Sequence, residues 1–406
     1  MSNIKQKEER YFMNTYKRND LIIKKAKNQY IWDENDNKYL DFTSGISVCN
    51  LGHCNENIIE AIKKQLNNLM HVSNLYYTEV QLKFGELLVK KTETILNDNK
   101  VNVFLSNSGA EANECAIKLA RKWGGLNPSK LGNRYEIICF KNSFHGRTMA
   151  TLSATGQEKF HNYFKPLQPK FLFADINNIN SVTNHLNNNT VAIMIEPIQG
   201  EGGVVTASFK FLQELRKVCD ENNLLLIFDE IQCGMGRTGT FYAFEHSKVN
   251  PDIITLAKGL ANGLPLGATL ANSRCYDSFT YGDHGSTFGG NPVSCAAAIA
   301  VLREMNESNF LYNVNKTASY LYKKLKILMD KYSIITEIRG LGLLLGIKLS
   351  ISGIEIVKFC LKNGLLVTCT QDTVIRLLPP LIVTEKDIDL SIKILENALK
   401  WKMTQT

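Results

Sequence analysis

The stretch LLLIFDEIQCGMGRTG (224–239), followed closely by PDIITLAKGLANG (251–263), decides the fold of this chain. Each contains a short run that is apolar almost throughout, 224–230 and 252–257, and each run leads into a charged side chain. Such runs are typical of strands that are buried on both faces of a parallel sheet. They predict two strands that deliver Asp229 and Lys258 at their carboxyl ends.

Three further runs upstream have the same character: VNVFLS (101–106), EIICF (136–140) and VAIMIEP (191–197). Between the runs, 112–123 and 209–222 carry apolar residues at helical spacing. Alternation of strands and helices predicts an α/β fold with a large, mostly parallel, seven-stranded-type sheet and helices on both faces.

The last third of the chain has a different pattern, which predicts a smaller α+β domain. Helical periodicity over 294–332 precedes two β-like runs around glycines in EIRGLGLLLGIKL (337–349). GLLVTCT (364–370) and VIRLLPPLIV (374–383) come next, and a final helix follows Thr384. Near the start, YIWDENDNKYLDF (30–42) predicts two strands joined by a turn. We expect an N-terminal segment (1–60) packed on the small domain, a large domain (61–300) and a small domain (301–406).

Composition excludes several classes of protein. The 406 residues are 44% hydrophobic and 21% charged, which rules out wholesale disorder, collagen and coiled coil. The net charge of +8 is spread along the chain, as in a solvated surface rather than a nucleic-acid footprint. No run suits a membrane span or signal peptide, and the ten cysteines form no C-x-x-C. We therefore expect a cytoplasmic protein with reduced thiols and no metal, membrane or nucleic-acid partner.

Ligands of open parallel sheets bind beyond the carboxyl ends of the strands. The residues there include a helix start at Ser108-Gly109-Ala110-Glu111, which predicts either a capping box or a phosphate site. Lys258 is either a lysine that extends to solvent or, in its apolar and glycine-rich surroundings, an amine of lowered pKa suited to Schiff-base chemistry.

Asp229 and Glu230 admit three interpretations. The acidic pair of a P-loop ATPase requires G-x-x-x-x-G-K-[ST], which the sequence lacks. The string GMGRTG (234–239) fits a dinucleotide-binding motif, but it neither follows a strand directly nor opens a long helical pattern. The third interpretation is a buried carboxylate that faces a cationic ring nitrogen.

Other loops offer side chains for a substrate or cofactor. Arg147 is either a surface arginine or a clamp for a carboxylate, and Phe144 either packs in the core or stacks on a flat ring. Ser286-Thr287 lie in the glycine-rich stretch DHGSTFGGNP (283–292), which predicts a plain turn or a phosphate-binding loop.

Taken together, these strings resemble the class III aminotransferases of pyridoxal-phosphate fold type I over nearly the whole chain. LLLIFDEIQCGMGRTG with PDIITLAKGLANG is similar to the class signature, and NSGAEANECAIKLAR, FHGRT, EPIQGEGGV, GSTFGGNP and RGLGLLLG are similar to its other landmarks. Within the class, LGHCNENIIEAI and HVSNLYYTE are most similar to the acetylornithine aminotransferases. Departures at Ala261-Asn262 and before Arg376 concern substrate preference.

The resemblance implies pyridoxal phosphate as cofactor, a homodimer, and a role for each matching residue. Lys258 binds the cofactor covalently and moves the proton, and Asp229 keeps the ring nitrogen protonated. The cofactor also contacts Ser108, Gly109, Ala110, Phe144, Glu230, Ile231, Gln232 and, from the neighbouring subunit, Thr287. The implied substrate residues are Arg147 for the carboxylate, Ser286, and the pair Glu201 and Arg376, which opens and closes for two different substrates.

The implied reaction is transamination of N-acetylornithine with 2-oxoglutarate, and of N-succinyl-LL-diaminopimelate in addition. The alternatives are another ω-aminotransferase acting on ornithine, 4-aminobutyrate or a diaminopelargonate precursor, a nucleotide-dependent oxidoreductase built on GMGRTG, and a catalytically silent binding protein. The presence of both Lys258 and Asp229 argues against the last.

Overall fold

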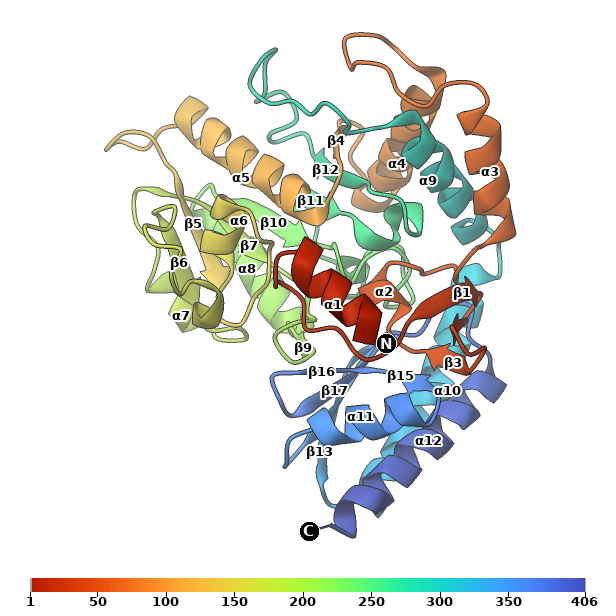
Figure 1. The fold of residues 1–406 in the computed structure, drawn as a ribbon. Coiled ribbons are helices and arrows are strands. Elements are labelled where there is room, and N and C mark those ends of the chain that lie inside the picture. Colours follow the sequence, from red (N-terminus) through yellow and green to blue (C-terminus); the bar gives the residue numbers. More distant parts are fainter. Residues whose placement is uncertain (1, 406) are drawn as a thin grey trace.

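A computed structural model describes residues 2–405. A seven-stranded sheet of order β4-β12-β11-β10-β7-β5-β6 forms its centre (Figure 1). The strands are β4 (Asn102–Ser106), β5 (Glu136–Phe140), β6 (Phe171–Ala174), β7 (Thr190–Ile195), β10 (Leu225–Asp229), β11 (Ile253–Leu256) and β12 (Gly267–Ala271). Neighbours pair in parallel except around β12, which is antiparallel to both β11 and β4. The expected α/β class with a mostly parallel large sheet is confirmed.

All five strands expected in this sheet are present, but β6 and β12 were not predicted. β12 has the sequence GATLA and continues the glycine-rich stretch after Lys258. Only Thr269 among its five residues is β-branched and none is aromatic, so the segment has a weak strand signal. The pairing with β4 and β11 makes it a strand, and all five of its residues are buried.

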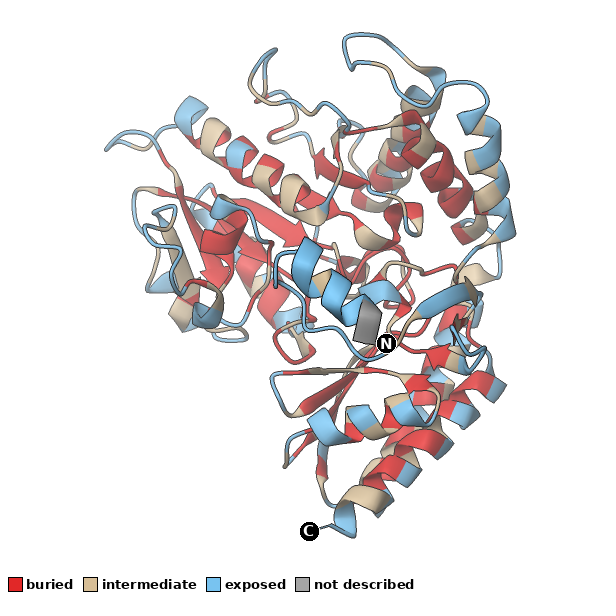
Figure 2. Cartoon of the chain, viewed as in Figure 1, coloured by how far each residue is buried: buried red, intermediate tan, exposed pale blue. Residues whose placement is uncertain are grey.

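Helices cover both faces of the sheet, and the alternation of side chains along each strand supplies both cores. Ile137, Met194 and Ile227 pack with α5 (Gly109–Leu126) on one face. Their neighbours Ile138, Ile195 and Phe228 belong to the core on the opposite face. That core also includes residues of α4 (Glu79–Leu96), α8 (Phe209–Glu221) and α9 (Pro292–Met305). Figure 2 shows the resulting buried centre.

The C-terminal part is built on a second sheet of order β13-β14-β17-β16. Its elements are α10 (Phe310–Lys331), β13 (Ile335–Leu341), β14 (Leu344–Leu349), α11 (Ile354–Lys362), β15 (Leu365–Leu366), β16 (Thr368–Thr370), β17 (Val374–Leu377) and α12 (Glu385–Met403). The expected single helical stretch 294–332 is two helices, α9 and α10. β17 ends before Pro379 and Pro380, which have no N–H to donate to a sheet.

The N-terminal strands join a third sheet that includes a C-terminal strand. β1 (Ile23–Lys27), β2 (Tyr30–Asp33) and β3 (Lys38–Asp41) follow in order, and β15 pairs in parallel with β3. The stretch 364–370, expected as one strand, is therefore divided between two sheets. Leu40 and Phe42 are buried in the C-terminal core. The division at residues 60 and 300 remains a proposal.

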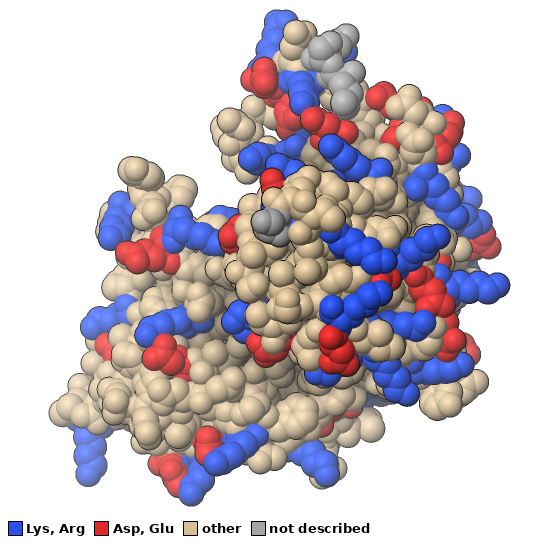
Figure 3. Space-filling view, turned by 90° about the horizontal axis from the view of Figure 1, so that it is seen from below, with Lys and Arg blue, Asp and Glu red and all other residues tan. Residues whose placement is uncertain are grey.

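The other elements are short or lie at the periphery: α1 (Ser2–Tyr11), α2 (Ser44–Ser47), α3 (Glu56–Leu66), α6 (Met149–Ala154), α7 (Ile179–Thr183), β8 (Ile198–Gln199) and β9 (Val205–Thr206). On the face shown in Figure 3, Lys and Arg side chains are interspersed with Asp and Glu. Over residues 2–405, every helix is too short or too polar to cross a membrane.

Candidate active site

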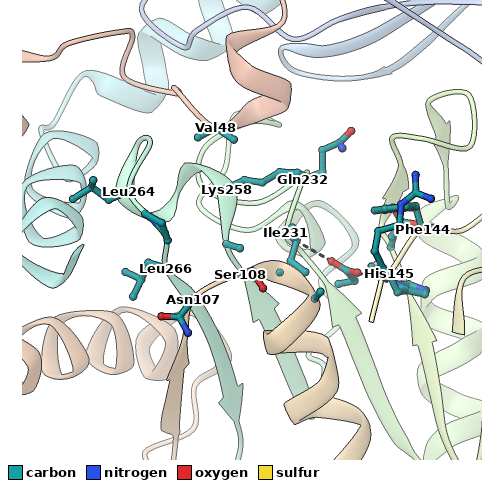
Figure 4. Close-up of a pocket in the computed structure, with 18 of the residues that line it drawn as sticks. Val48, Asn107, Ser108, Phe144, His145, Ile231, Gln232, Lys258, Leu264 and Leu266 are labelled. Atoms are coloured by element: carbon teal, nitrogen blue, oxygen red, sulfur yellow. Dashed lines mark hydrogen bonds and ion pairs between the residues drawn. The ribbon is translucent and has the colours of Figure 1, made fainter. Parts of the chain in front are cut away.

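A cavity of about 410 Å³ lies at the carboxyl edge of the large sheet. Segments that follow β4, β5, β7, β10 and β11 all contribute to its wall. Figure 4 shows the side chains around it. The predicted site residues that line it are Ser108, Gly109, Ala110, Phe144, Arg147, Asp229, Ile231, Gln232 and Lys258. The strand-end argument thus brings together residues that are as far as 150 positions apart (108 and 258) in the sequence.

Lys258 occupies the cavity with a free amine. It lies two residues after the end of β11 and has a left-handed backbone, with φ of 42°. No hydrogen bond or ion pair holds its Nζ within the part of the chain that the structure describes. Burial lowers the pKa of Lys258, although the carboxylates of Glu201 and Asp229 oppose the shift. A larger fraction of neutral amine follows, and neutral amine is the nucleophilic form.

Asp229 is fixed by three donors at the end of β10. Its Oδ2 accepts a hydrogen bond from Asn113 Nδ2 at 2.8 Å and lies 2.8 Å from His145 Nδ1. The backbone N–H of Ile231 donates to Oδ1 at 3.1 Å. Asn113 is positioned in turn by Thr255, whose Oγ1 donates to its Oδ1 at 2.8 Å. The carboxylate is therefore held in one orientation beside the cavity.

The start of α5 presents free donors to the same cavity. Ser108 is the N-cap, and its Oγ accepts from the backbone N–H of Glu111 at 3.2 Å. In a capping box the Glu111 carboxylate would accept from the backbone N–H of Ser108. It accepts instead from the backbone N–H of Asn107, one residue earlier. The N–H groups of Gly109 and Ala110 have no partner among residues 2–405. Capping and anion binding are thus compatible here, since they use different N–H groups.

A second carboxyl group, Glu196, lies in the wall after β7. Its Oε2 accepts from the backbone N–H of Phe144 at 3.0 Å. Burial, and then the nearby Asp229 carboxylate, raises the pKa of Glu196 well above its usual value. The surroundings of Glu196 therefore favour its neutral, protonated form.

Glu201 and Arg376 form an ion pair beside Gln232. Arg376 Nη1 lies 2.6 Å from Glu201 Oε1, and it also donates to Gln232 Oε1 at 3.2 Å. Burial alone would raise the pKa of Glu201, but the Arg376 guanidinium reverses the direction and lowers it. The pair does not itself line the cavity, but it contacts Gln232, which does.

Arg147 and Phe144 lie at the more exposed side of the cavity. The Arg147 guanidinium carbon is 4.1 Å from the centre of the Phe160 ring, and Phe160 meets Phe144 edge to face at 5.9 Å. No carboxylate of the described residues forms a salt bridge with Arg147. Its charge is therefore available to an anionic ligand, while the aromatic rings orient its planar head.

Besides Glu201 and Arg376, three predicted residues lie outside this cavity. Ser286 and Thr287 line a separate cavity of about 830 Å³. Ser286 Oγ accepts from Asn107 Nδ2 at 3.2 Å, which connects the two cavities. Glu230 was expected to contact the cofactor, but its carboxylate accepts from the backbone N–H groups of Ala243 and Phe244 at 2.8 and 2.9 Å. The structure gives Glu230 this capping role instead.

The residues missed as site residues include Val48, His145 and Glu196, which line the cavity, and Asn113, which holds Asp229. His145 is part of FHGRT and Glu196 lies near the end of the run 191–197, but the sequence analysis assigned neither a role. Asn113 lies one helical turn after the start of α5, on its buried side. A buried amide needs a hydrogen-bond partner, so this position could have been predicted to contact a polar group of the site.

The string GMGRTG serves packing rather than nucleotide binding. Arg237 is fully buried, and its guanidinium donates to the carbonyl oxygens of Leu343 and Pro379 and to side-chain oxygens of Ser44 and Asn50. The glycine segment opens no helix, since the next helical element is the short turn 243–247. The motif on which the oxidoreductase hypothesis depended therefore does not form a dinucleotide-binding turn.

Pyridoxal phosphate has a phosphate at one end, an aldehyde, and a ring nitrogen that acts best when protonated. The cavity offers matching groups: free N–H donors at a helix start, an unpartnered amine and a fixed carboxylate. The donor set therefore fits this cofactor. Among residues 2–405, no cluster of His, Cys, Asp and Glu is arranged to hold a metal ion.

Comparisons with known proteins agree with this chemistry. The model of the family described as aminotransferase class-III matches residues 11–399. An acetylornithine aminotransferase from Caldanaerobacter subterraneus subsp. tengcongensis is 46% identical and covers 97% of this chain and 98% of its own length.

Two solved structures are also similar to this chain. An N-acetylornithine aminotransferase from Stenotrophomonas maltophilia has a TM-score of 0.84 at 32% identity, covering 99% of this chain and 100% of its own. An ornithine aminotransferase from Toxoplasma gondii, described with partial occupancy of PLP at its active site, has a TM-score of 0.91 at 30% identity, covering 99% and 95%. This chain belongs to the class III aminotransferases, and its cofactor is pyridoxal phosphate.

Proposed function

We propose that this enzyme transfers the terminal amino group of N2-acetyl-L-ornithine to 2-oxoglutarate, giving N-acetyl-L-glutamate 5-semialdehyde and L-glutamate. The observation that supports the catalytic part is the unpartnered amine of Lys258 in the same cavity as the fixed carboxylate of Asp229. The substrate is supported by relatives from several genera that are named acetylornithine aminotransferase and are 45–46% identical.

Bound pyridoxal phosphate supplies an aldehyde for the amino group and a ring that accepts the electrons of the broken C–H bond. Nζ of Lys258 would hold the cofactor covalently, and as a free amine it would take the proton from the carbon that bears the reacting amine. The Asp229 carboxylate holds a proton on the ring nitrogen, because an anion at hydrogen-bond distance favours the cationic form. The N–H groups of Gly109 and Ala110 hold the phosphate, Phe144 packs on the ring, and Ser108, Ile231 and Gln232 complete the pocket.

Substrate binding requires a cation some distance from the reacting amine. In N-acetylornithine the α-carboxylate lies at the far end of the molecule, and Arg147 is free to bind it. Glutamate and 2-oxoglutarate carry a second carboxylate close to the reacting carbon. Arg376 binds that group when its pair with Glu201 opens, so that one site accepts both substrates.

We further propose that the active enzyme is a homodimer. Ser286 and Thr287 line a cavity separate from that of Lys258. In the proposed dimer, Thr287 contacts the cofactor phosphate in the active site of the partner subunit, and Ser286 lies near the substrate there. A cytoplasmic location remains a prediction.

Two other donors remain in question. N-succinyl-LL-2,6-diaminopimelate shares the carboxylate, the acylated amine and the reactive primary amine of N-acetylornithine. Ornithine is the substrate named for the structural relatives from Toxoplasma gondii and Plasmodium. Ornithine differs by a charged α-amino group, which places a cation near the positively charged Arg147 and disfavours binding.

A donor panel with 2-oxoglutarate tests the assignment. We expect kcat/KM for N-acetylornithine to exceed that for ornithine and for 4-aminobutyrate by at least about a hundredfold, or about 2.7 kcal/mol. The succinylated diaminopimelate should fall within about tenfold of N-acetylornithine. A preference for ornithine would contradict the proposed substrate and leave the aminotransferase chemistry intact. Inactivity toward every donor would contradict the proposed roles of Lys258 and Asp229.

A further inference from the structure

The loop 200–204, which joins β8 to β9, is held at its carbonyl oxygens by side chains of the C-terminal sheet. Arg376 Nη1 of β17 donates to the carbonyl oxygen of Gly200 at 3.0 Å. Arg339 Nη1 of β13 donates to that of Gly203 at 3.3 Å, and β9 lies next to this sheet (Figure 1). The position of the loop is therefore set by the same sheet that carries Arg376.

The carbonyl oxygen of Glu201, in the middle of this loop, accepts two hydrogen bonds from the turn between β16 and β17. Thr370 Oγ1 donates at 2.5 Å and Gln371 Nε2 donates at 3.3 Å. No backbone N–H in the part of the chain that the structure describes donates to this oxygen. Thr370 is buried, where a hydrogen bond is stronger than in water. Its hydroxyl is thus the main contact that holds the backbone at residue 201.

The turn has a backbone conformation that depends on such contacts. Gln371 and Asp372 have φ of 50° and 60°, in the left-handed region that residues other than glycine seldom adopt. This conformation persists where surrounding contacts compensate its cost. Gln371 provides them, since its amide also donates to Gln157 Oε1 at 3.2 Å. The turn is therefore fixed against the large sheet's loops on two sides.

Glu201 is held by the hairpin at two points. Its carboxylate pairs with Arg376 of β17 at 2.6 Å, and its carbonyl oxygen bonds to Thr370 of β16, the strand that pairs with β17. With the carbonyl held, the carboxylate leaves Arg376 only by rotation of its own side chain. Without that bond the loop can also withdraw as a whole, which gives the open pair more conformations. The bond from Thr370 therefore favours the closed pair.

We propose that Thr370 is a positioning residue that keeps Glu201 on Arg376 and thereby sets the affinity of the site for a second carboxylate. The inference rests on the proposed function, in which Arg376 binds that carboxylate only when the pair is open. While the closed pair predominates, the apparent Kd of a dicarboxylate is its intrinsic Kd divided by the open fraction. A ligand whose single carboxylate binds Arg147 uses the closed form, and its affinity does not depend on that fraction.

Binding of glutarate to the holoenzyme, measured by calorimetry, tests the proposal. Glutarate has the carboxylate spacing of 2-oxoglutarate but no keto group, so it binds without reacting. Thr370→Val keeps the shape of the side chain and removes the hydroxyl, and it should lower the Kd for glutarate about fivefold, because one hydrogen bond of the closed form is lost. Thr370→Ser restores the hydroxyl and should have the native affinity.

Two controls separate this effect from a general loosening of the fold. N-acetyl-L-norvaline, which is N-acetylornithine without the terminal amine, has one carboxylate, and its Kd should change less than about twofold in Thr370→Val. Thr373→Val makes the same substitution in the same turn, where the hydroxyl bonds only to the carbonyl oxygen of Gln371 at 3.3 Å, and should leave both affinities unchanged.

Unchanged or weaker binding of glutarate to Thr370→Val would overturn the proposal. So would an equal gain for N-acetyl-L-norvaline, an equal effect of Thr373→Val, or a Thr370→Ser variant that behaves like Thr370→Val. Arg376→Gln should weaken glutarate at least about tenfold. If it does and Thr370→Val has no effect, only this inference fails. If it does not, the role of Arg376 in the proposed function fails as well. Absence of N-acetyl-L-norvaline binding to the native enzyme would contradict the proposed substrate and leave the glutarate comparison valid.

Discussion

Lys258 is half-buried and Arg237 is fully buried, and the surroundings of these two cations differ in hydrogen bonding. Neither forms a salt bridge with a carboxylate in the part of the chain described here. Arg237 donates to oxygens of four other residues from three distant segments, whereas the amine of Lys258 donates to none. Burial of a charge is costly unless polar groups compensate. Arg237 is compensated by fixed oxygens and stabilises the fold, while the uncompensated amine of Lys258 shifts toward its neutral form and is available for chemistry.

The largest effect is expected at Lys258. Lys258→Ala should lower the transamination rate at least about 10⁴-fold, because it removes both the covalent attachment and the proton-transfer group. The apoenzyme should unfold at the same or a slightly higher denaturant concentration, since a buried amine without hydrogen bonds is removed. Steady-state kinetics and chemical denaturation check the two parts. Strong destabilisation would mean that Lys258 resembles Arg237 after all.

Arg237→Met should have the opposite profile. Removing the guanidinium leaves buried oxygens of Asn50, Leu343 and Pro379 without a donor, and we expect a loss of about 3–5 kcal/mol in the free energy of unfolding. Activity per folded molecule at low temperature should change little. Arg303→Met is the matched control, because Arg303 is exposed and should change stability by less than about 0.5 kcal/mol. Similar losses in both variants would remove the structural role assigned to Arg237.

Arg147 shares one feature with Arg237 and one with Lys258. Aromatic rings hold its guanidinium in place, but no carboxylate of residues 2–405 pairs with its charge. Arg147→Gln should raise the KM for N-acetylornithine about tenfold to a hundredfold with a smaller change in kcat, because a bidentate contact with a carboxylate is lost. Lys159→Gln removes another cation over the same Phe160 ring, at 5.0 Å, from a residue that does not line the cavity. The KM of Lys159→Gln for N-acetylornithine should remain unchanged. An equal rise in KM in both variants would mean that the contact with the Phe160 ring, and not the contact with the substrate carboxylate, is responsible.

The smallest expected effect concerns His53, whose Nε2 lies 2.8 Å from Oδ2 of the buried Asp41. The folded-state pKa of His53 is raised to about 10, above its unfolded value of 6.5. The resulting stability is fully present below pH 6.5 and is lost as pH rises toward 10. Over this range the native enzyme should lose about 1–2 kcal/mol of unfolding free energy that His53→Gln does not lose, because solvent screens a ring that is only partly buried. Chemical denaturation at a series of pH values measures the difference. Parallel pH profiles of the two proteins would contradict the charge assigned to His53.

The central strands and the groups at their ends could be predicted because the signals are local. A run such as 224–230 is apolar throughout, and its last residues must face the edge where parallel strands meet their ligands. The same reasoning failed for β12, whose small residues give no periodic signal, and for 364–370, where one apolar run is shared by two sheets. Glu230 was assigned with its neighbour Asp229, although adjacent strand residues point to opposite faces.

The sequence by itself determined five of the central strands, the family, and the charged groups at one edge of the sheet, since hydrophobic periodicity and short motifs are properties of neighbouring residues. Only the tertiary structure decided which buried polar groups are satisfied. The oxygens that hold Arg237 come from residues 44, 50, 343 and 379, and the donors that fix Asp229 include Asn113 and His145. Whether such a cation stabilises the fold or takes part in the reaction depends on hydrogen-bond acceptors from distant segments, and a local sequence pattern carries no information about those segments.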